Sequence, residues 1–154
     1  MILLGLGSNL GDRADQLARA KAALRAQQID VVAESSIHET PALMPEGAPQ
    51  SWDIAFLNQV IAVKTTLPPL MLLEQLKTIE VALGRAPRDR WAPREIDLDM
   101  LAYDDLVLND AALQLPHPHM HARRFVMAPL VEIAADWVHP TLHKTSLQLL
   151  AEIV

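Results

Sequence analysis

Two aspartates, Asp97 and Asp99, occupy alternate positions in a stretch of strictly alternating character. Ile96, Leu98 and Met100 are apolar, whereas the residues between them are acidic. A period of two is typical of a β-strand with one buried face, so the pattern predicts a strand whose other face carries carboxylates. Aspartate is a poor strand former. A hard cation such as Mg²⁺, which binds carboxylate and phosphate oxygens, would explain its use here.

A cluster of arginines precedes this stretch: Arg85, Arg88, Arg90 and Arg94. Guanidinium groups pair well with phosphate oxygens. A D-x-D pair alone is weak evidence for a metal site, because solvent-facing strand positions are commonly polar. The arginine cluster strengthens the interpretation, since a basic loop that leads into a carboxylate-lined strand suits a Mg²⁺–nucleoside triphosphate complex without a P-loop.

The composition predicts one globular domain over residues 1–154, with 51% hydrophobic and 21% charged residues. The net charge of -6 argues against nucleic-acid binding. Six of the 13 basic residues nevertheless fall within 85–94 and 123–124, which favours a small anionic ligand. The chain has no cysteine, and residues 1–7 resemble neither a signal peptide nor a membrane span. We therefore expect a cytoplasmic protein without disulfides or membrane contact.

The apolar pattern also predicts the elements that must position these side chains. The first half should contain a strand over residues 2–6, a helix capped by Asp12 with Leu17, Ala20 and Leu24 on its buried face, a strand over 31–38, a loop over 40–49, and a strand over 56–63. The second half should contain a helix opened by Pro68-Pro69, with Leu72, Leu76, Ile79 and Leu83 as its core face and Gly84 at its end. The strand of Asp97 should then turn at 103–105 into a hairpin return strand, and helices should cover 125–134 and 146–153. Glu80 lies beside the apolar stripe of its helix and is expected to be exposed.

Two further patterns suggest other sites but are not favoured. The glycines at 5, 7 and 11 resemble a dinucleotide-binding fingerprint, but the third comes one residue late, so a strand-to-helix turn is the better interpretation. His117, His119 and His121 could suggest zinc, yet there is no cysteine to complete such a site. His117 is better suited to donate a hydrogen bond to a phosphate.

The segment Arg90-x-Ala92-Pro93-Arg94-x-x-Asp97-Leu98-Asp99-Met100-Leu101 resembles the signature of the 6-hydroxymethyl-7,8-dihydropterin pyrophosphokinases of folate biosynthesis. Further motifs resemble that family in the same order: residues 6–12, Thr40-Pro41-x-Leu43, Phe56-Leu57-Asn58, residues 116–120 and Arg123-x-Phe125. The resemblance implies an α+β fold, a ferredoxin-like antiparallel sheet with helices packed on it, in a single domain. It implies transfer of diphosphate from ATP to the hydroxymethyl group of 6-hydroxymethyl-7,8-dihydropterin, with release of AMP.

The resemblance also implies a role for individual residues. The catalytic set would be Arg85, Arg94, Asp97 and Asp99, with the two aspartates holding two Mg²⁺ ions. ATP would contact Glu80, Arg85, Arg88, Arg94, Met100, His117 and Arg123. The pterin would contact Thr40, Pro41, Leu43, Phe56, Asn58, Trp91 and Phe125, where Phe56 and Phe125 would sandwich the ring and Asn58 would read its polar edge. Trp91 would also belong, with Arg88 and Arg90, to a loop that closes over both substrates.

Two alternatives stay open from the sequence. One is a related Mg²⁺-dependent ATP phosphotransferase that acts on another heterocycle, and the other is a catalytically inactive pterin- or nucleotide-binding module. We expect a monomer whose partners are ATP and the pterin. The role of His119 is unassigned.

Overall fold

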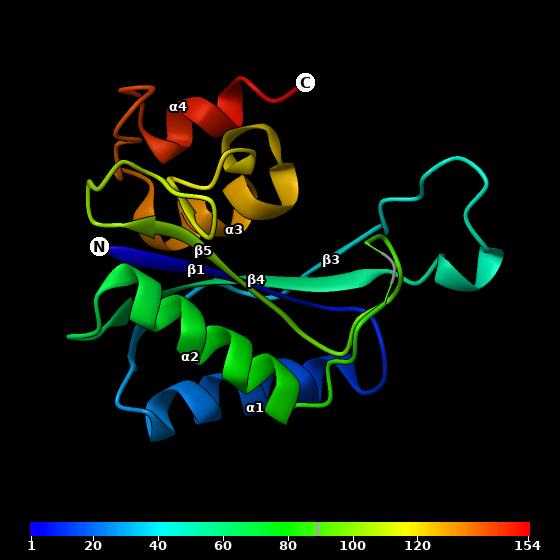
Figure 1. Ribbon diagram of the computed structural model, residues 1–154. Coiled ribbons are helices and arrows are strands. Elements are labelled where there is room, and N and C mark those ends of the chain that lie inside the picture. Colours follow the sequence, from blue (N-terminus) through cyan, green and yellow to red (C-terminus); the bar gives the residue numbers. More distant parts are fainter. Residues whose placement is uncertain (89) are drawn as a thin grey trace.

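The computed structural model describes residues 1–88 and 90–154 (Figure 1). The strands are β1 (Ile2–Ser8), β2 (Asp30–Glu34), β3 (His38–Thr40), β4 (Phe56–Lys64), β5 (Asp97–Tyr103), β6 (Leu108–Asn109) and β7 (Gln114–Leu115). The helices are α1 (Arg13–Ala26), α2 (Pro69–Ala82), α3 (Arg124–Ala134) and α4 (Ser146–Ala151), with short 3₁₀ turns η1 (Gln50–Trp52) and η2 (Met120–Ala122). The predicted order of strands and helices is confirmed for most of the chain.

The main sheet has the strand order β2-β4-β1-β5, with β3 also paired to β4 and every pairing antiparallel. Because α1 follows β1 and α2 follows β4, these elements form the β-α-β-β-α-β pattern of the ferredoxin-like fold. The expected α+β, ferredoxin-like class is therefore correct. β1 lies between β4 and β5, which places the ends of three strands beside one another.

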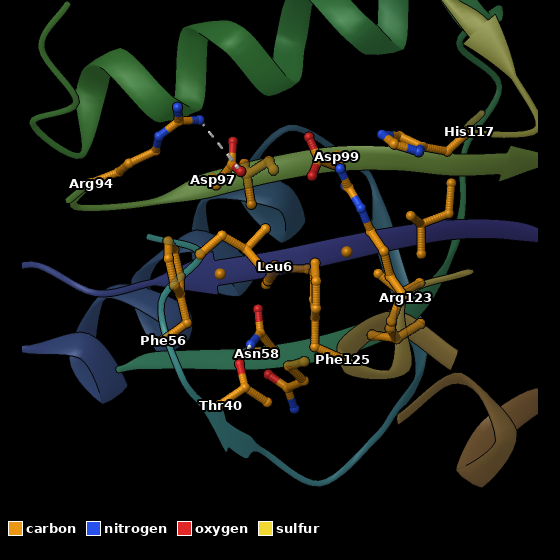
Figure 2. A pocket seen from close by; sticks show the side chains of 18 of the residues that line it. Leu6, Thr40, Phe56, Asn58, Arg94, Asp97, Asp99, His117, Arg123 and Phe125 are labelled. Atoms are coloured by element: carbon orange, nitrogen blue, oxygen red, sulfur yellow. Dashed lines mark hydrogen bonds and ion pairs between the residues drawn. The ribbon is translucent and has the colours of Figure 1, made fainter. Parts of the chain in front are cut away.

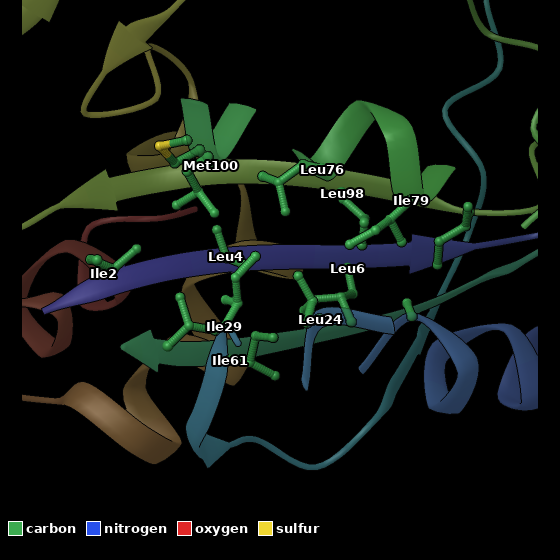
Figure 3. Packing of buried hydrophobic residues seen from close by; sticks show 14 of the residues in the cluster. Ile2, Leu4, Leu6, Leu24, Ile29, Ile61, Leu76, Ile79, Leu98 and Met100 are labelled. Atoms are coloured by element: carbon green, nitrogen blue, oxygen red, sulfur yellow. The ribbon is translucent and has the colours of Figure 1, made fainter. Parts of the chain in front are cut away.

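Helices cover both faces of this sheet. α1 and α2 lie on one side and α3 and α4 on the other (Figure 1). Leu4, Leu24 and Leu76 pack in the core beneath α1 and α2 (Figure 3). Leu3 and Leu130 belong to the second core, beneath α3 and α4. Both cores are apolar, and none of the helices in the described parts of the chain has the length and apolar content needed to cross a membrane.

Local signals fix the ends of the first two helices as predicted. The side chain of Asp12 accepts a hydrogen bond from the backbone N–H of Asp15 at 3.1 Å, which caps α1. Pro68 immediately precedes α2, and Gly84 follows it with φ of +99°, a conformation that glycine adopts without steric cost. The apolar residues predicted for the inner faces of both helices are buried.

Two strand predictions were wrong. The expected strand over 31–38 is divided into β2 and β3, because the Ser35 side chain accepts a hydrogen bond from Val60 N–H and the regular ladder stops there. The expected return strand over 106–108 does not pair with β5. Instead, β6 pairs with β7, and β5 stays at the edge of the main sheet. At this edge, groups of α2 and of the segment after β7 hydrogen-bond to the β5 backbone, which brings both segments beside the carboxylates of β5.

Candidate active site

A cavity of about 390 Å³ gathers residues from β1, β3, β4 and β5, from α2 and α3, and from the loops that follow β3, α2 and β7. Figure 2 shows its side chains, with the two aspartates along β5 and the two phenylalanines on either side of Asn58. Of the predicted site residues, the cavity is lined by Thr40, Pro41, Leu43, Phe56, Asn58, Glu80, Arg85, Trp91, Arg94, Asp97, Asp99, His117, Arg123 and Phe125. Arg88 and Met100 are not among its lining residues.

The alternating residues of β5 divide, as predicted, into a buried apolar set and a pair of carboxylates that face the cavity. Ile96, Leu98 and Met100 are buried, at 0–4% exposure, whereas Asp97 and Asp99 line the cavity. Burial, together with the negative charges of Asp97 and Glu80, raises the pKa of Asp99 to about 7. A cation bound between the two aspartates would stabilise the ionised form of both carboxylates.

Glu80 is the clearest correction at this end of the cavity. Its expected exposure was wrong, because the residue is only 7% exposed. One carboxylate oxygen accepts hydrogen bonds from the backbone N–H of Leu98 at 2.8 Å and from Arg85 at 2.5 Å. Burial raises the pKa of Glu80, although these donors and the charge of Arg85 oppose the rise. Glu80 thus holds Arg85 against β5, where Arg85 also donates to Asp97 at 3.1 Å.

The other arginines of the loop differ in what they contact. Arg94 lies 3.7 Å from the second carboxylate oxygen of Asp97, inside the cavity. Arg88 instead forms a paired contact with Glu95, at 2.5 and 2.7 Å, and this pairing lowers the pKa of the Glu95 carboxyl. In this conformation the guanidinium of Arg88 is therefore committed to a carboxylate outside the cavity.

His117 lies near Asp99 and Arg123 at the far end of the aspartate row (Figure 2). Burial, followed by the positive charges of Arg123 and His119, lowers the pKa of His117 to about 4. Its Nδ1 accepts a hydrogen bond from the backbone N–H of His119 at 3.2 Å, so the proton of the neutral ring is on Nε2. His117 can thus donate a hydrogen bond at neutral pH.

The opposite end of the cavity has a different chemical character. Asn58 is buried in β4 and donates a hydrogen bond to the hydroxyl of Thr40 at 2.5 Å. Phe56 and Phe125 supply two aromatic faces (Figure 2). Gly7 leaves this space open, because a Cβ there would come within 3.2 Å of the Asn58 side-chain oxygen and 3.5 Å of the Phe56 ring. A flat, polar-edged ring is the kind of ligand that such surroundings fit.

A second cavity, of about 240 Å³, adjoins the first, and both are lined by Leu73, Leu98, Asp99 and His117. Met100 lines this second cavity, with a mainly apolar segment over 111–114. The two cavities together therefore extend from the aromatic pair, past the carboxylates, to an apolar recess.

Sequence reasoning missed several residues of the site. Lys77 lines the main cavity one helical turn before Glu80, on the same face of α2, and that spacing could have identified it. Gly5 and Gly7 form part of the floor. Asn9 donates to the carbonyl of Ile54 at 3.0 Å and accepts from the backbone of Arg94 at 2.8 Å. It thereby ties the loops before β4 and β5 to the end of β1, a contact that no local pattern reveals.

The three histidines do not act as one group. His117 lines the cavity, while the ring of His121 packs edge-on against His139 with 6.0 Å between centroids. Within the described part of the chain, no three His, Cys, Asp or Glu side chains are grouped so that they could hold a metal ion by themselves. A metal at Asp97 and Asp99 would therefore need ligands from a substrate or water.

Fold and site together define an α+β phosphotransferase with a carboxylate–arginine end and an aromatic end. Residues 3–135 match the family of 7,8-dihydro-6-hydroxymethylpterin-pyrophosphokinase (HPPK). The chain is similar to two enzymes named 2-amino-4-hydroxy-6-hydroxymethyldihydropteridine pyrophosphokinase. One, from Methylorubrum extorquens, is 48% identical over 137 residues, 88% of this chain and 83% of the relative. The other, from Aquifex aeolicus, is 38% identical over 143 residues, 93% of this chain and 86% of the relative.

Solved structures agree on the fold. The chain superposes on Plasmodium falciparum HPPK-DHPS, crystallised with pterin and p-hydrobenzoate, with a TM-score of 0.73 at 16% identity. The match covers 98% of this chain but only 44% of that one, so the chain spans less than half of the HPPK-DHPS protein. The chain belongs to the 7,8-dihydro-6-hydroxymethylpterin-pyrophosphokinase family. It is a transferase of folate biosynthesis with ATP as co-substrate, and the matches give no support to an inactive binding module or to another phosphotransferase.

Proposed function

We propose that the two ends of this cavity bind ATP and 6-hydroxymethyl-7,8-dihydropterin side by side, so that diphosphate passes from ATP to the pterin hydroxymethyl group. The observation that carries the proposal is the arrangement of one cavity, with Asp97 and Asp99 at one end and an aromatic pair with a buried amide at the other. Residues 1–154 would act as one catalytic domain. In this reaction the hydroxymethyl oxygen loses its proton to solvent and forms a bond to the β-phosphorus. The bond from the β-phosphorus to the oxygen that bridges it to the α-phosphorus breaks, and AMP leaves with that oxygen.

Asp97 and Asp99 would hold the Mg²⁺ ions. The donor set fits, since Mg²⁺ commonly takes one or two carboxylates and completes its shell with phosphate oxygens and water. The raised pKa of Asp99 also fits, because a cation would offset the repulsion between neighbouring carboxylates. When bound, the ions would neutralise charge that develops on the entering and leaving oxygens.

The cationic side chains would bind the triphosphate around these carboxylates. Arg85 and Arg94 both contact Asp97, and phosphate oxygens would compete with that carboxylate for their guanidinium groups. The Nε2–H group of neutral His117 would donate a hydrogen bond to a phosphate oxygen, and Arg123 would add a positive charge beside it. Fixed donors of this kind stabilise developing charge without reorganising during the reaction.

The adjoining 240 Å³ cavity would receive the nucleoside, with Met100 and Leu73 against the base. Lys77 lines the main cavity one turn after Leu73 and one turn before Glu80 on α2. It would therefore contact ATP between the nucleoside and the arginines. Glu80 would act on ATP through Arg85, which it holds.

The pterin would stack between Phe56 and Phe125, while Asn58 and Thr40 would bind its polar edge. Pro41, Leu43 and Trp91 would border the ring. Trp91 is 38% exposed and its ring packs under the guanidinium of Arg90, at 4.9 Å from the ring centroid. Closure of this loop over both substrates would exclude water, which competes for the phosphoryl group.

The direct test is to incubate the protein with Mg²⁺, ATP and the hydroxymethyl pterin and to resolve the nucleotides. The expected products are AMP and the pterin diphosphate in equal amounts, with none formed in EDTA. Formation of ADP, or of AMP without pterin diphosphate, would refute diphosphate transfer.

A further inference from the structure

The pterin end of the cavity rests on a short stretch of sheet. β3 pairs only with β4, through three residue pairs that include Thr40 with Phe56 and His38 with Asn58. The segment over 41–55, which joins these two strands, contains only the short turn η1. Thr40 and Phe56 form the last pair of this ladder, and Asn58 donates a hydrogen bond to Thr40. Because a ladder of three pairs is weak, further contacts beside this last pair can add to its rigidity.

Arg13, the first residue of α1, contacts β3 and the residue immediately before β4. One guanidinium nitrogen donates to the carbonyl oxygen of Ala55 at 2.8 Å, and the other lies 3.0 Å from a carboxylate oxygen of Glu39. Ala55 directly precedes Phe56, and Glu39 directly precedes Thr40. The Arg13 side chain is 29% exposed and does not itself line the cavity. Arg13 therefore connects the backbone of Ala55, next to Phe56, with the side chain of Glu39, next to Thr40.

We propose that Arg13 is a positioning residue for the pterin, which holds the last pair of the β3–β4 ladder, Thr40 and Phe56, in place before the substrate binds. This inference rests on the proposed pterin role of that end of the cavity. A guanidinium suits the task because its donors lie in one rigid plane, so two acceptors are held at a fixed spacing. If Thr40 and Phe56 are already held in their bound positions, less conformational entropy is lost when the pterin binds. The affinity for the pterin is then higher.

The effect should be confined to one substrate. Asn9 separately holds the carbonyl of Ile54, so the loop stays attached to β1 when Arg13 is replaced. Among the described residues, the carboxylates and arginines of the ATP end form no hydrogen bond or ion pair with Arg13. Replacement of Arg13 should therefore make the positions of Thr40 and Phe56 less fixed, and should leave ATP binding and the fold intact.

The experiment compares Arg13→Met, Arg13→Lys and Glu39→Gln with wild type, by equilibrium binding of each substrate, by steady-state kinetics and by thermal melting. Arg25→Met is the matched control, since Arg25 lies on the same helix and its side chain forms, among the described residues, a single ion pair at 3.9 Å with Glu34. For Arg13→Met we expect a rise of about tenfold in the Kd and KM for pterin, equal to about 1.4 kcal/mol. The Kd for ATP and kcat at saturating pterin should stay within about twofold, and Arg25→Met should match wild type.

The remaining variants test the bridge itself. Arg13→Lys should retain part of the pterin affinity, because an ammonium can reach one acceptor but cannot hold both in a plane. Glu39→Gln should raise the pterin Kd about two- to threefold alone, and should add nothing in the Arg13→Met background.

Three results would overturn the inference: unchanged pterin binding in Arg13→Met, equal losses for ATP and pterin, or additive losses in the double variant. A wild-type protein that binds pterin but releases no AMP would instead refute the proposed function. The binding comparison among the variants would still decide the role of Arg13.

Discussion

Replacement of Asp99 by Asn should affect stability and turnover in opposite directions. Asp99 lies in the cavity beside Asp97 and near Glu80, and among the described residues none donates a hydrogen bond to its carboxylate. Ionising this carboxyl in the folded protein is unfavourable, because burial and the neighbouring negative charges raise its pKa from 3.8 to about 7. An Asn side chain has the same shape without the charge, so the metal-free variant should be more stable than wild type.

The size and pH range of the gain follow from that pKa. A rise from 3.8 to about 7 corresponds to about 4 kcal/mol against folding when the carboxyl is ionised in both states. An unpaired amide in the same place costs about 1–3 kcal/mol, which leaves a net gain of about 1–3 kcal/mol. The pKa of Asp99 is higher in the folded state than in the unfolded state, so the unfolded state loses its proton at lower pH. The free energy of unfolding of the wild type therefore falls by about 4 kcal/mol as the pH rises from about 4 to 7. The gain of the variant should therefore be full at pH 8 and absent at pH 4.

Thermal melting in EDTA is the measurement, with Asp105→Asn as the control because Asp105 is exposed in the turn after β5. At about 2–4 °C per kcal/mol, Asp99→Asn should raise the Tm by roughly 2–12 °C at pH 8. In the assay with Mg²⁺ and both substrates, its turnover should fall by more than about 100-fold, since one metal ligand is lost. An unchanged or lower Tm at pH 8, or an equal rise at pH 4, would refute the electrostatic argument. Wild-type turnover would refute the metal role.

Three other predictions test separate parts of the molecule. Gly7→Ala should raise the KM for pterin about tenfold with little change for ATP, because its Cβ would crowd Asn58 at 3.2 Å; equal effects on both substrates in kinetics would count against the pterin end. Phe125→Ala should weaken pterin binding by about 1 kcal/mol more than Phe125→Leu, which keeps the apolar volume without the ring, and calorimetry with each substrate can compare them. The pKa of Glu132 is lowered to about 2 by hydrogen bonds from Ser36 and His38, so it adds stability above pH 4.5 that is lost as pH falls toward 2. Glu132→Gln should be less stable than wild type at pH 6 and equal to it at pH 2 in denaturant titrations.

Much of the fold and of the carboxylate end of the cavity could be predicted because the information is local. The alternation around Asp97 and Asp99 states which side chains are buried and which share a face, and a strand has only two faces. Asp12 and Gly84 mark helix ends through hydrogen bonds and dihedral angles within a few residues. The order of motifs likewise indicated which residues would meet in one cavity.

The remainder depended on partners distant in the sequence. The burial of Glu80 was missed because its helix position looks exposed, and only the packing of α2 beside β5 brings the Leu98 N–H to its carboxylate. Likewise, the strand expected over 106–108 had the right composition, but the choice of β7 rather than β5 as its neighbour is a matter of tertiary packing.

The sequence by itself determined the two-faced strand, the helix boundaries and the types of group available for phosphate and ring binding. Only the tertiary structure decided which arginines contact Asp97, which one contacts Glu95, and that Arg13 bridges Glu39 of β3 and the backbone just before β4. The physical reason is that periodicity and capping act over one or two turns, whereas a long charged side chain can reach several partners. Which of them it contacts is set by the packing of segments that are far apart along the chain.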